Sequence, residues 1–297
     1  MNILTCETGK VKYNLSCFLN GILNENFFNC YYEKKPYHAT GIDVFGVFIT
    51  NSFFNELLCH NKKITNLYLV ENGVEIKRGE YVDIDNELNV EKTLELHQSG
   101  ATVVVNDFHN YDESVLLLNS YFQNLFNSPC GINLYLTPKN QKGFNAHFDP
   151  HDVFIFQLKG TKQWKIYEAA INLPLKSQEY TIRNHDLRGL TLEKEMKKGD
   201  LLYIPRGWVH EAITVNETSV HITLGVFSFT RADVLLEILS EHILSDASFR
   251  KSFPPCAQTE SESIDGLSNV MLKLLKKISE GDIIDQVVKR YTKRFNV

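Results

Sequence analysis

A succession of short apolar segments separated by turns occupies the chain between about residues 130 and 229. The segments are too short for stable helices and are rich in β-branched and aromatic residues, a composition that favours strands. They comprise residues 131–137, 153–158, 163–167, 201–205 and 219–227, with Lys159–Lys162 as a hairpin turn between the second and the third. Many short strands at this spacing are typical of a barrel or of a double-sheet jelly roll. We therefore predict a mainly β fold of the jelly-roll type over this part of the chain.

The segments on either side of this β region carry helical as well as extended patterns. On the N-terminal side we predict helices over residues 24–35 and 113–126, and strands over 46–50, 64–70, 74–76 and 101–105. The Asn72-Gly73 pair marks a tight turn between two of these strands. After residue 230 we predict helices over 233–245, 267–278 and 283–295, and a linker or mobile loop over 248–263. The C-terminal part of the chain is therefore expected to be helical.

The overall composition argues against several classes of protein. The formal net charge of -5 gives no sign of the strongly basic surface of a nucleic-acid-binding protein, so we expect no nucleic-acid partner. The basic residues of the C-terminal helices could form a surface for nucleic acid or a ribosome, but solvated helix faces are the more common case and the interpretation that we adopt. The six cysteines form no CxxC pair or regular framework, which is typical of free thiols in a reducing compartment. No segment approaches the roughly 20 apolar residues of a membrane span, and the N-terminus lacks a signal-peptide pattern, so we expect a cytoplasmic protein.

Two histidines and one aspartate stand at the spacing of a metal site. His147 and Asp149 are two residues apart, so on an extended strand their side chains lie on the same face. His210 follows a strand pattern and a Pro-Arg-Gly turn that could direct its side chain toward the same end of the barrel. Two histidines and one carboxylate that leave further coordination positions open are typical of non-haem Fe(II) oxygenases. The sequence therefore predicts an iron site at these residues.

Three other histidines are considered as ligands. His151 would extend the His-x-Asp pair to three groups on one face, although we assign it to the substrate rim or to the surroundings of the ligands. His221, on a predicted strand, is an alternative third ligand, but a buried histidine bonded to a neighbour is the more common case. His185 is expected in a surface loop. Spacing alone leaves His151 and His221 eligible for the metal.

An Fe(II) oxygenase that uses 2-oxoglutarate also needs a cation for the distal carboxylate of this co-substrate. Lys162 lies in the turn after the strand that follows Asp149 and is the best candidate, although an exposed turn lysine fits the spacing equally well. Asn133 and Tyr135 alternate on one predicted strand and could supply hydrogen bonds in the same pocket, or could simply line the barrel. The candidates for the rim that contacts the substrate are Phe144, His151, Arg206 and Trp208.

Several motifs together resemble the cupin-like JmjC-domain oxygenases. They are Asn133–Pro138, the run from Gly143 to Phe154 around His147-Phe148-Asp149, Gln157–Trp164, and Gly199–Ala212, which contains Pro205-Arg206-Gly207-Trp208-Val209-His210. The branch that the chain resembles most is that of the ribosomal oxygenases, which hydroxylate arginine or histidine side chains of ribosomal proteins. The aromatic segment from Phe27 to Pro36 is also similar to the N-terminal part of that branch. The resemblance covers roughly residues 20–230.

The resemblance implies a 2-oxoglutarate- and Fe(II)-dependent dioxygenase that uses O2 to hydroxylate a side chain of a protein or peptide, with release of succinate and CO2. It implies that His147, Asp149 and His210 bind iron. It assigns Lys162 to the distal carboxylate of 2-oxoglutarate, and it assigns Asn133 and Tyr135 to the co-substrate pocket. The implied fold is a double-stranded β-helix with an N-terminal α/β extension. A catalytic domain over residues 1–230 would precede a helical dimerisation region over 231–297.

The chain departs from the ribosomal oxygenases in one respect. Those proteins carry a winged-helix domain after the dimerisation helices, and the 87 residues that follow His210 (297 − 210) leave no room for both. A ribosomal protein, another protein and a small ribosomally made peptide are therefore all candidate substrates. Two other functions remain open: demethylation of an N-methyl group by the same chemistry, and a cupin-like binding module without enzymatic activity.

Overall fold

The chain divides into two compact units, which the computed structural model describes over residues 5–8, 11–41, 57–58, 65–178, 187–252, 260–280 and 283–293. The first unit comprises Met1–Gln123 and Cys130–Phe227, and the second comprises Asn124–Pro129 and Ser228–Val297. The predicted strand over 46–50 and the predicted surface loop around His185 lie outside the described residues.

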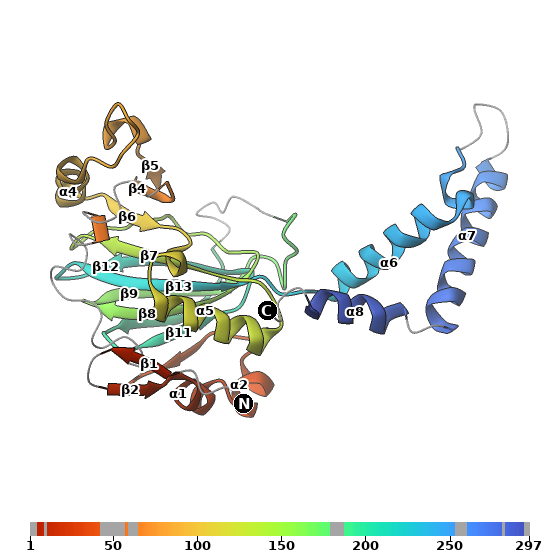
Figure 1. The fold of residues 1–297 in the computed structure, drawn as a ribbon, viewed down its shortest axis with the longest axis horizontal. Coiled ribbons are helices and arrows are strands. Elements are labelled where there is room, and N and C mark those ends of the chain that lie inside the picture. The colour runs from red at the N-terminus through yellow and green to blue at the C-terminus, as the bar shows by residue number, and fades with distance from the viewer. Residues whose placement is uncertain are drawn as a thin grey trace. The chain divides into compact units, whose positions relative to one another are not determined.

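An eight-stranded sheet forms one wall of the first unit (Figure 1). Its strand order is β3-β11-β8-β13-β7-β6-β4-β5, and all neighbouring strands are antiparallel. The strands are β3 (Tyr37–Ala39), β4 (Leu67–Glu71), β5 (Val74–Glu75), β6 (Thr102–Val105), β7 (Cys130–Thr137), β8 (Asp152–Lys159), β11 (Leu201–Ile204) and β13 (Ser219–Val226). Every strand of this sheet from β4 onward was predicted from the sequence, with small shifts at the ends.

A three-stranded sheet with the order β10-β9-β12 packs against the large sheet. Its strands are β9 (Lys162–Ala169), β10 (Leu190–Met196) and β12 (Trp208–Thr214). The buried cluster between the sheets consists of Val153 and Ile155 of β8, Trp164 and Ile166 of β9, Met196 of β10, and Leu202 and Ile204 of β11. Removing apolar surface from water stabilises such a core by about 25 cal/mol per Å². Two antiparallel sheets over a common core form the predicted jelly roll.

Two strands of the smaller sheet are not evident from the sequence. β10 reads Leu-Thr-Leu-Glu-Lys-Glu-Met, and only Met196 at its end is fully buried, so its apolar content is low. For β12 the sequence predicts a turn that leads to His210, whereas the structure continues a strand to Thr214. Pairing with β9 explains both strands, because long-range partners supply the hydrogen bonds that local propensity does not indicate.

The N-terminal segment docks onto the edge of the large sheet through β3, which pairs with β11. The helix α2 (Glu25–Cys30) begins at Asn24, whose side chain accepts a hydrogen bond from Phe27 N (3.2 Å). Phe27 is 1% exposed, and its ring lies 5.1 Å from that of Tyr203 on β11. The predicted helix over 24–35 is shorter in the structure, because the chain turns after Cys30 and Glu33 adopts a φ of 58°. The preceding elements are β1 (Thr5–Thr8), β2 (Val11–Asn14) and α1 (Leu15–Ile22).

The second unit is helical, as predicted for this part of the chain. Its long helices are α6 (Arg231–Ser245), α7 (Glu260–Glu280) and α8 (Ile283–Lys293). α6 begins with a capping box between Thr230 and Asp233, and Arg290 of α8 pairs with Glu241 (2.5 Å) and Glu237 (3.7 Å) of α6. α7 starts within the predicted linker. None of the helices in the described residues combines the length and the apolar character needed to cross a membrane.

The remaining described helices belong to connections within the chain. They are α4 (Val90–Ser99), α5 (Glu113–Phe126), η1 (Arg78–Glu80), η2 (Phe108–Asn110) and η4 (Ala247–Arg250). The range of α5 agrees with the prediction, and its buried residues recur at helical spacing.

Candidate active site

A cavity of about 350 Å³ is lined by residues of both sheets. β7 contributes Asn133 and Tyr135, and β9 contributes Lys162 and Trp164. In each pair the residues are two positions apart, so strand alternation directs their side chains to the same face. His147, Asp149 and His210 line the same cavity. The candidate metal ligands and the candidate co-substrate residues therefore share one pocket.

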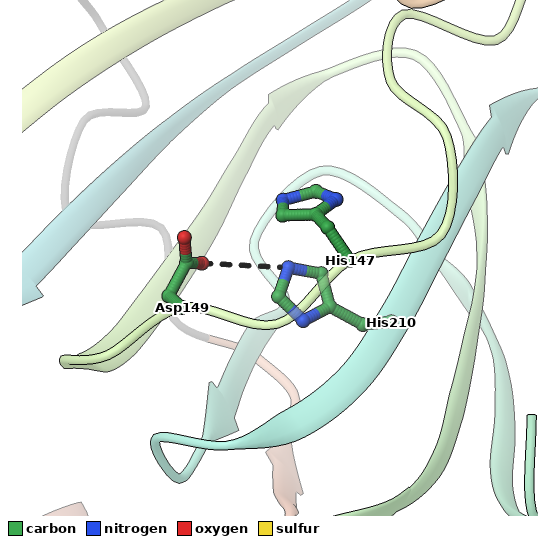
Figure 2. A group of neighbouring side chains, drawn as sticks. All are labelled: His147, Asp149 and His210. Carbon is green, nitrogen blue, oxygen red and sulfur yellow. Dashed lines mark ion pairs between the residues drawn. The ribbon is translucent and has the colours of Figure 1, made fainter. Parts of the chain in front are cut away.

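The side chains of His147, Asp149 and His210 point toward one another (Figure 2). One potential ligand atom of each residue lies within 4.8 Å of those of the other two. Asp149 Oδ2 is 3.5 Å from His210 Nε2, and the two imidazole rings are 4.5 Å apart at their centroids. Among the described residues, no other group of histidines, cysteines and acidic residues has this arrangement.

An isolated antiparallel β-bridge between His147 and His210 brings together the two segments that carry the candidate ligands. His147 N donates to His210 O (3.1 Å), and His210 N donates to His147 O (2.8 Å). Asp149 lies outside the strands, and its carbonyl oxygen accepts a hydrogen bond from Gly207 N (2.9 Å). The prediction that one strand carries both His147 and Asp149 is therefore wrong, since β8 begins at Asp152. The side chains converge because the segment before β8 pairs with the start of β12.

Backbone carbonyl groups fix the orientation of both imidazole rings. His147 Nδ1 lies 2.8 Å from Asn145 O, and His210 Nδ1 lies 3.1 Å from Trp208 O. A carbonyl oxygen only accepts hydrogen bonds, so each Nδ1 carries the proton and each Nε2 keeps its lone pair. Burial, together with the neighbouring His147, lowers the pKa of His210 to about 4. His210 is therefore a neutral ligand at physiological pH.

The carboxylate of Asp149 supplies the negative charge of this group. Burial alone would raise its pKa, but the adjacent His210, His151 and His147 lower that pKa below its usual value. One carboxylate and two imidazole nitrogens on one side of a cavity match the donor set that binds Fe(II) and leaves coordination positions open. The residues present therefore fit a non-haem iron ion.

Lys162 is buried inside the cavity and is not an exposed turn lysine. Its side chain is 5% exposed, and Nζ donates to Thr137 Oγ1 (3.2 Å). Within the described part of the chain, no carboxylate lies in salt-bridge range of this ammonium group. Burial lowers the pKa of Lys162 to about 7. A buried ammonium group without an anionic partner is costly, so this end of the pocket favours an anionic ligand.

Two more buried polar atoms surround Lys162. Trp164 Nε1 and His221 Nδ1 have no hydrogen-bond partner among the residues that the structure describes. The His221 ring stacks on Tyr135 at 4.8 Å and lies edge-on to Trp164 at 5.7 Å, so this side chain belongs to the cavity wall. His221 is not among the residues that form the three-residue group at Asp149. Of the predicted pocket residues, Tyr135 lies beside His221, and Asn133 Oδ1 accepts from Asp107 N (3.1 Å).

The structure brings two of the four predicted rim residues to the cavity. Phe144 lines it within 6.1 Å of the His147 ring, and His151 lines it against Phe227 (4.6 Å). Arg206 and Trp208 do not line it. Arg206 is 7% exposed and is bound to Asp152, whereas Trp208 packs against the core cluster between the sheets. A rim position for Arg206 is therefore wrong, because its side chain is buried against Asp152. The rim position of Trp208, whose side chain is partly buried, stays a prediction.

Sequence reasoning missed several residues of the cavity wall. Trp164, Glu211 and Phe227 all line the cavity. The alternation that places Lys162 on the inner face of β9 also places Trp164 there and could have identified it. No local pattern identifies Glu211, because its role in the wall depends on a strand that only long-range pairing creates.

Comparison with known proteins shows what the chain is similar to. Residues 104–234 match the JmjC domain family. The sequence is 27% identical over 293 residues to the bifunctional lysine-specific demethylase and histidyl-hydroxylase NO66 of Aedes aegypti, covering 91% of this chain and 46% of that protein. The corresponding protein of Dictyostelium discoideum is 29% identical over 257 residues, covering 81% of this chain and 49% of the relative. The chain thus spans less than half the length of either relative.

The fold is shared with a solved bacterial structure. The Escherichia coli ribosomal oxygenase YcfD superposes with a TM-score of 0.61 at 17% sequence identity, covering 91% of this chain and 71% of that chain. This similarity confirms the predicted double-stranded β-helix. The fold is therefore that of a cupin, and the predicted resemblance to the JmjC-domain oxygenases is confirmed over residues 104–234.

Proposed function

We propose that the protein is a 2-oxoglutarate- and Fe(II)-dependent dioxygenase that hydroxylates a side chain of a protein or peptide. The observation that carries this proposal is one cavity that holds the His147, Asp149 and His210 group and the buried ammonium group of Lys162, which has no carboxylate partner among the described residues. A metal site alone would fit many enzymes, but a metal site together with a buried cation fits a small chelating dicarboxylate. The relatives are named as hydroxylases, demethylases and ribosomal oxygenases.

In this proposal His147, Asp149 and His210 hold the iron through both Nε2 atoms and the Asp149 carboxylate. The bound iron supplies O2 activation, coupled to conversion of 2-oxoglutarate to succinate and CO2, that makes an unactivated C–H bond reactive. The protein itself contributes by holding the metal ligands in position. Carbonyl oxygens of Asn145 and Trp208 hold the two imidazole rings with their lone pairs toward Asp149.

Lys162 binds the distal carboxylate of 2-oxoglutarate at the closed end of the cavity. Thr137 holds the ammonium group, and the walls of Tyr135 and Trp164 exclude water from the ion pair. Removing water strengthens the attraction between the ammonium group and the carboxylate. Asn133 and Tyr135 complete the co-substrate pocket, and Phe144 and His151 contact the substrate at its rim.

The decisive experiment is a turnover assay with Fe(II) and 2-oxoglutarate. The intact chain is expected to consume 2-oxoglutarate and form succinate, even uncoupled from a substrate. His147→Ala should abolish this turnover, since it removes a ligand. Lys165→Met, on the outer face of the same strand as Lys162 and 43% exposed, is the matched control and should be fully active. Full turnover of 2-oxoglutarate by His147→Ala would contradict the proposed metal ligand. If the intact chain consumed no 2-oxoglutarate, the alternative of a binding module without enzymatic activity would be favoured.

The substrate is proposed to be a ribosomal protein, following the resemblance to the E. coli ribosomal oxygenase. Stable hydroxylation is the proposed outcome, and N-methyl demethylation is the alternative because the relatives are named as both demethylases and hydroxylases. Mass spectrometry of a lysate treated with and without 2-oxoglutarate separates them. A gain of one oxygen identifies hydroxylation, and the loss of a methyl group identifies demethylation.

We also propose that the second unit mediates a homodimer. Its helices expose many large apolar side chains, namely Leu235, Leu236, Leu239, Leu244, Leu267, Met271, Leu272, Leu275 and Ile284. Contiguous apolar surface of this kind is typical of an interaction site. Light scattering should give the mass of two chains, and Leu236→Lys combined with Leu272→Lys should shift the protein to one chain.

A further inference from the structure

A buried ion cluster lies behind the candidate metal ligands. Arg206 Nη1 lies 2.8 Å from Asp152 Oδ2, and Arg206 Nη2 lies 2.6 Å from Glu33 Oε1. The Arg206 side chain is 7% exposed and that of Asp152 is fully buried. One guanidinium group thus binds two carboxylates from distant parts of the chain.

Tyr203 closes this cluster into a ring. Its hydroxyl donates to Asp152 Oδ1 (2.7 Å) and accepts a hydrogen bond from Glu33 N (3.0 Å). Glu33 holds a left-handed φ of 58°, a conformation that a residue other than glycine keeps only where its surroundings hold it. The ring therefore holds the N-terminal segment at Glu33, and it also holds the side chains of Tyr203 and Asp152.

The cluster is joined to both metal motifs through short stretches of backbone. Asp152 is close in sequence to Asp149, and Arg206 is close to His210. Arg206 N lies 3.4 Å from Asp152 Oδ1, and the next residue, Gly207, donates from its N to Asp149 O (2.9 Å). The segment that carries Asp149 and the turn that leads into β12 with His210 are therefore joined at Arg206 and Gly207.

Such a cluster acts on geometry more than on stability. Removing charges from water costs nearly as much as their attraction returns, so a buried ion pair adds little net stability over apolar packing. A planar guanidinium group that binds two carboxylates nevertheless allows only a narrow range of positions for both. The segments that carry Asp149 and His210 are accordingly held in one relative arrangement.

We propose that Arg206 is a positioning residue for the metal site, and that Glu33 couples this site to the docking of the N-terminal segment. The inference rests on the proposed metal-binding role of His147, Asp149 and His210. With Arg206 bound to both Asp152 and Glu33, the Asp149 carboxylate and the His210 ring are already in place before a metal ion arrives. Weakening the contact of Arg206 with Asp152 or with Glu33 allows Asp149 and His210 a wider range of positions, and this lowers the affinity for the metal ion.

The test measures metal binding without turnover, by titrating the full chain with Co(II) and recording its visible absorption. Glu33→Gln keeps the size of the side chain and removes its charge, and Arg206→Lys keeps the charge and removes the two-pronged geometry. Arg290→Lys is the matched control, because Arg290 also binds two carboxylates but is 49% exposed in the second unit. Thermal melting checks that each variant is folded.

The dissociation constant for Co(II) should rise about tenfold in Glu33→Gln and by more than that in Arg206→Lys, within the roughly 10- to 100-fold range seen for residues that orient metal ligands. The absorption bands should shift in both variants, and the control should match the intact chain. Unchanged affinity and bands in folded Glu33→Gln would overturn the inference, even if Arg206→Lys fails to fold. Absence of Co(II) binding by the intact chain would instead overturn the proposed metal site.

Discussion

The two ends of the cavity are built in different ways. At the metal end, His147 and Asp149 are partly exposed and lie in a connecting segment that a single bridge ties to β12. At the other end, Lys162 is 5% exposed and begins the regular strand β9. The metal end thus depends on a long-range contact between a connecting segment and β12. The lysine end depends on the register of β9.

Charge is also handled differently at the two ends. The Asp149 carboxylate has three imidazoles around it, and they hold its pKa low despite burial. The Lys162 ammonium has no carboxylate near it among the described residues, and burial lowers its pKa to about 7. The metal end therefore favours a cation, whereas the lysine end favours an anion. This difference indicates that the two ends of the cavity select for groups of opposite charge.

The largest expected effect is on the metal end. Asp149→Ala removes the charged ligand, so Co(II) affinity should fall by more than about 100-fold, beyond the 10- to 100-fold typical of residues that only orient ligands. Calorimetric titration measures the affinity, with Lys165→Met as the control. Tight Co(II) binding by Asp149→Ala would contradict this contrast between the two ends, because the negative charge would then not be needed at the metal end.

The next effect isolates the lysine end. Lys162→Met preserves much of the side-chain volume and removes the ammonium group, so the KM for 2-oxoglutarate should rise by at least about 30-fold, the equivalent of about 2 kcal/mol for a broken buried ion pair. Co(II) affinity measured without 2-oxoglutarate should stay within about twofold of the intact chain. Equal losses in both quantities would contradict the separation of the two ends.

The same contrast explains how much could be predicted from the sequence. The place of Asn133 and Tyr135 on one strand face follows from alternation, and the jelly-roll strands follow from short apolar runs separated by turns, which are patterns between neighbours in the chain. Spacing leaves Lys162 undecided between the pocket and an exposed turn, because its burial depends on the register of β9. The inward turn of Arg206 does not follow, because its partner Glu33 belongs to a remote segment. β10 also escapes prediction, since most of its side chains face water and its stability comes from pairing with β9. Features created by contacts between distant segments leave no local pattern.

A pH dependence should also distinguish the ends. Binding of the 2-oxoglutarate dianion favours charged Lys162, so it raises the pKa of this lysine above its value of about 7 in the free protein. Below pH 7 the lysine is already charged and affinity is constant. Above pH 7 binding takes up a proton, and the dissociation constant should rise toward about tenfold per pH unit. Calorimetry in buffers of different ionisation enthalpy measures this uptake.

Lys162→Arg provides the control for this pH dependence. A guanidinium group stays charged throughout this range, so the uptake should disappear in the variant. A proton uptake that persists in Lys162→Arg would assign the titration to another group.

The smallest expected effect concerns the wall between the two ends. Trp164 lies close to both, since its ring lies 5.7 Å from Lys162 Nζ and 6.0 Å from the His210 ring, and within the described part of the chain its buried Nε1 has no hydrogen-bond partner. If the co-substrate carboxylate accepts a hydrogen bond from this Nε1, Trp164→Phe should raise the KM for 2-oxoglutarate about fivefold, the equivalent of about 1 kcal/mol. Metal affinity without 2-oxoglutarate should be unchanged. A loss of metal affinity as large as the change in KM would instead mean that the indole supports the His210 ring, and that the two ends are linked through it.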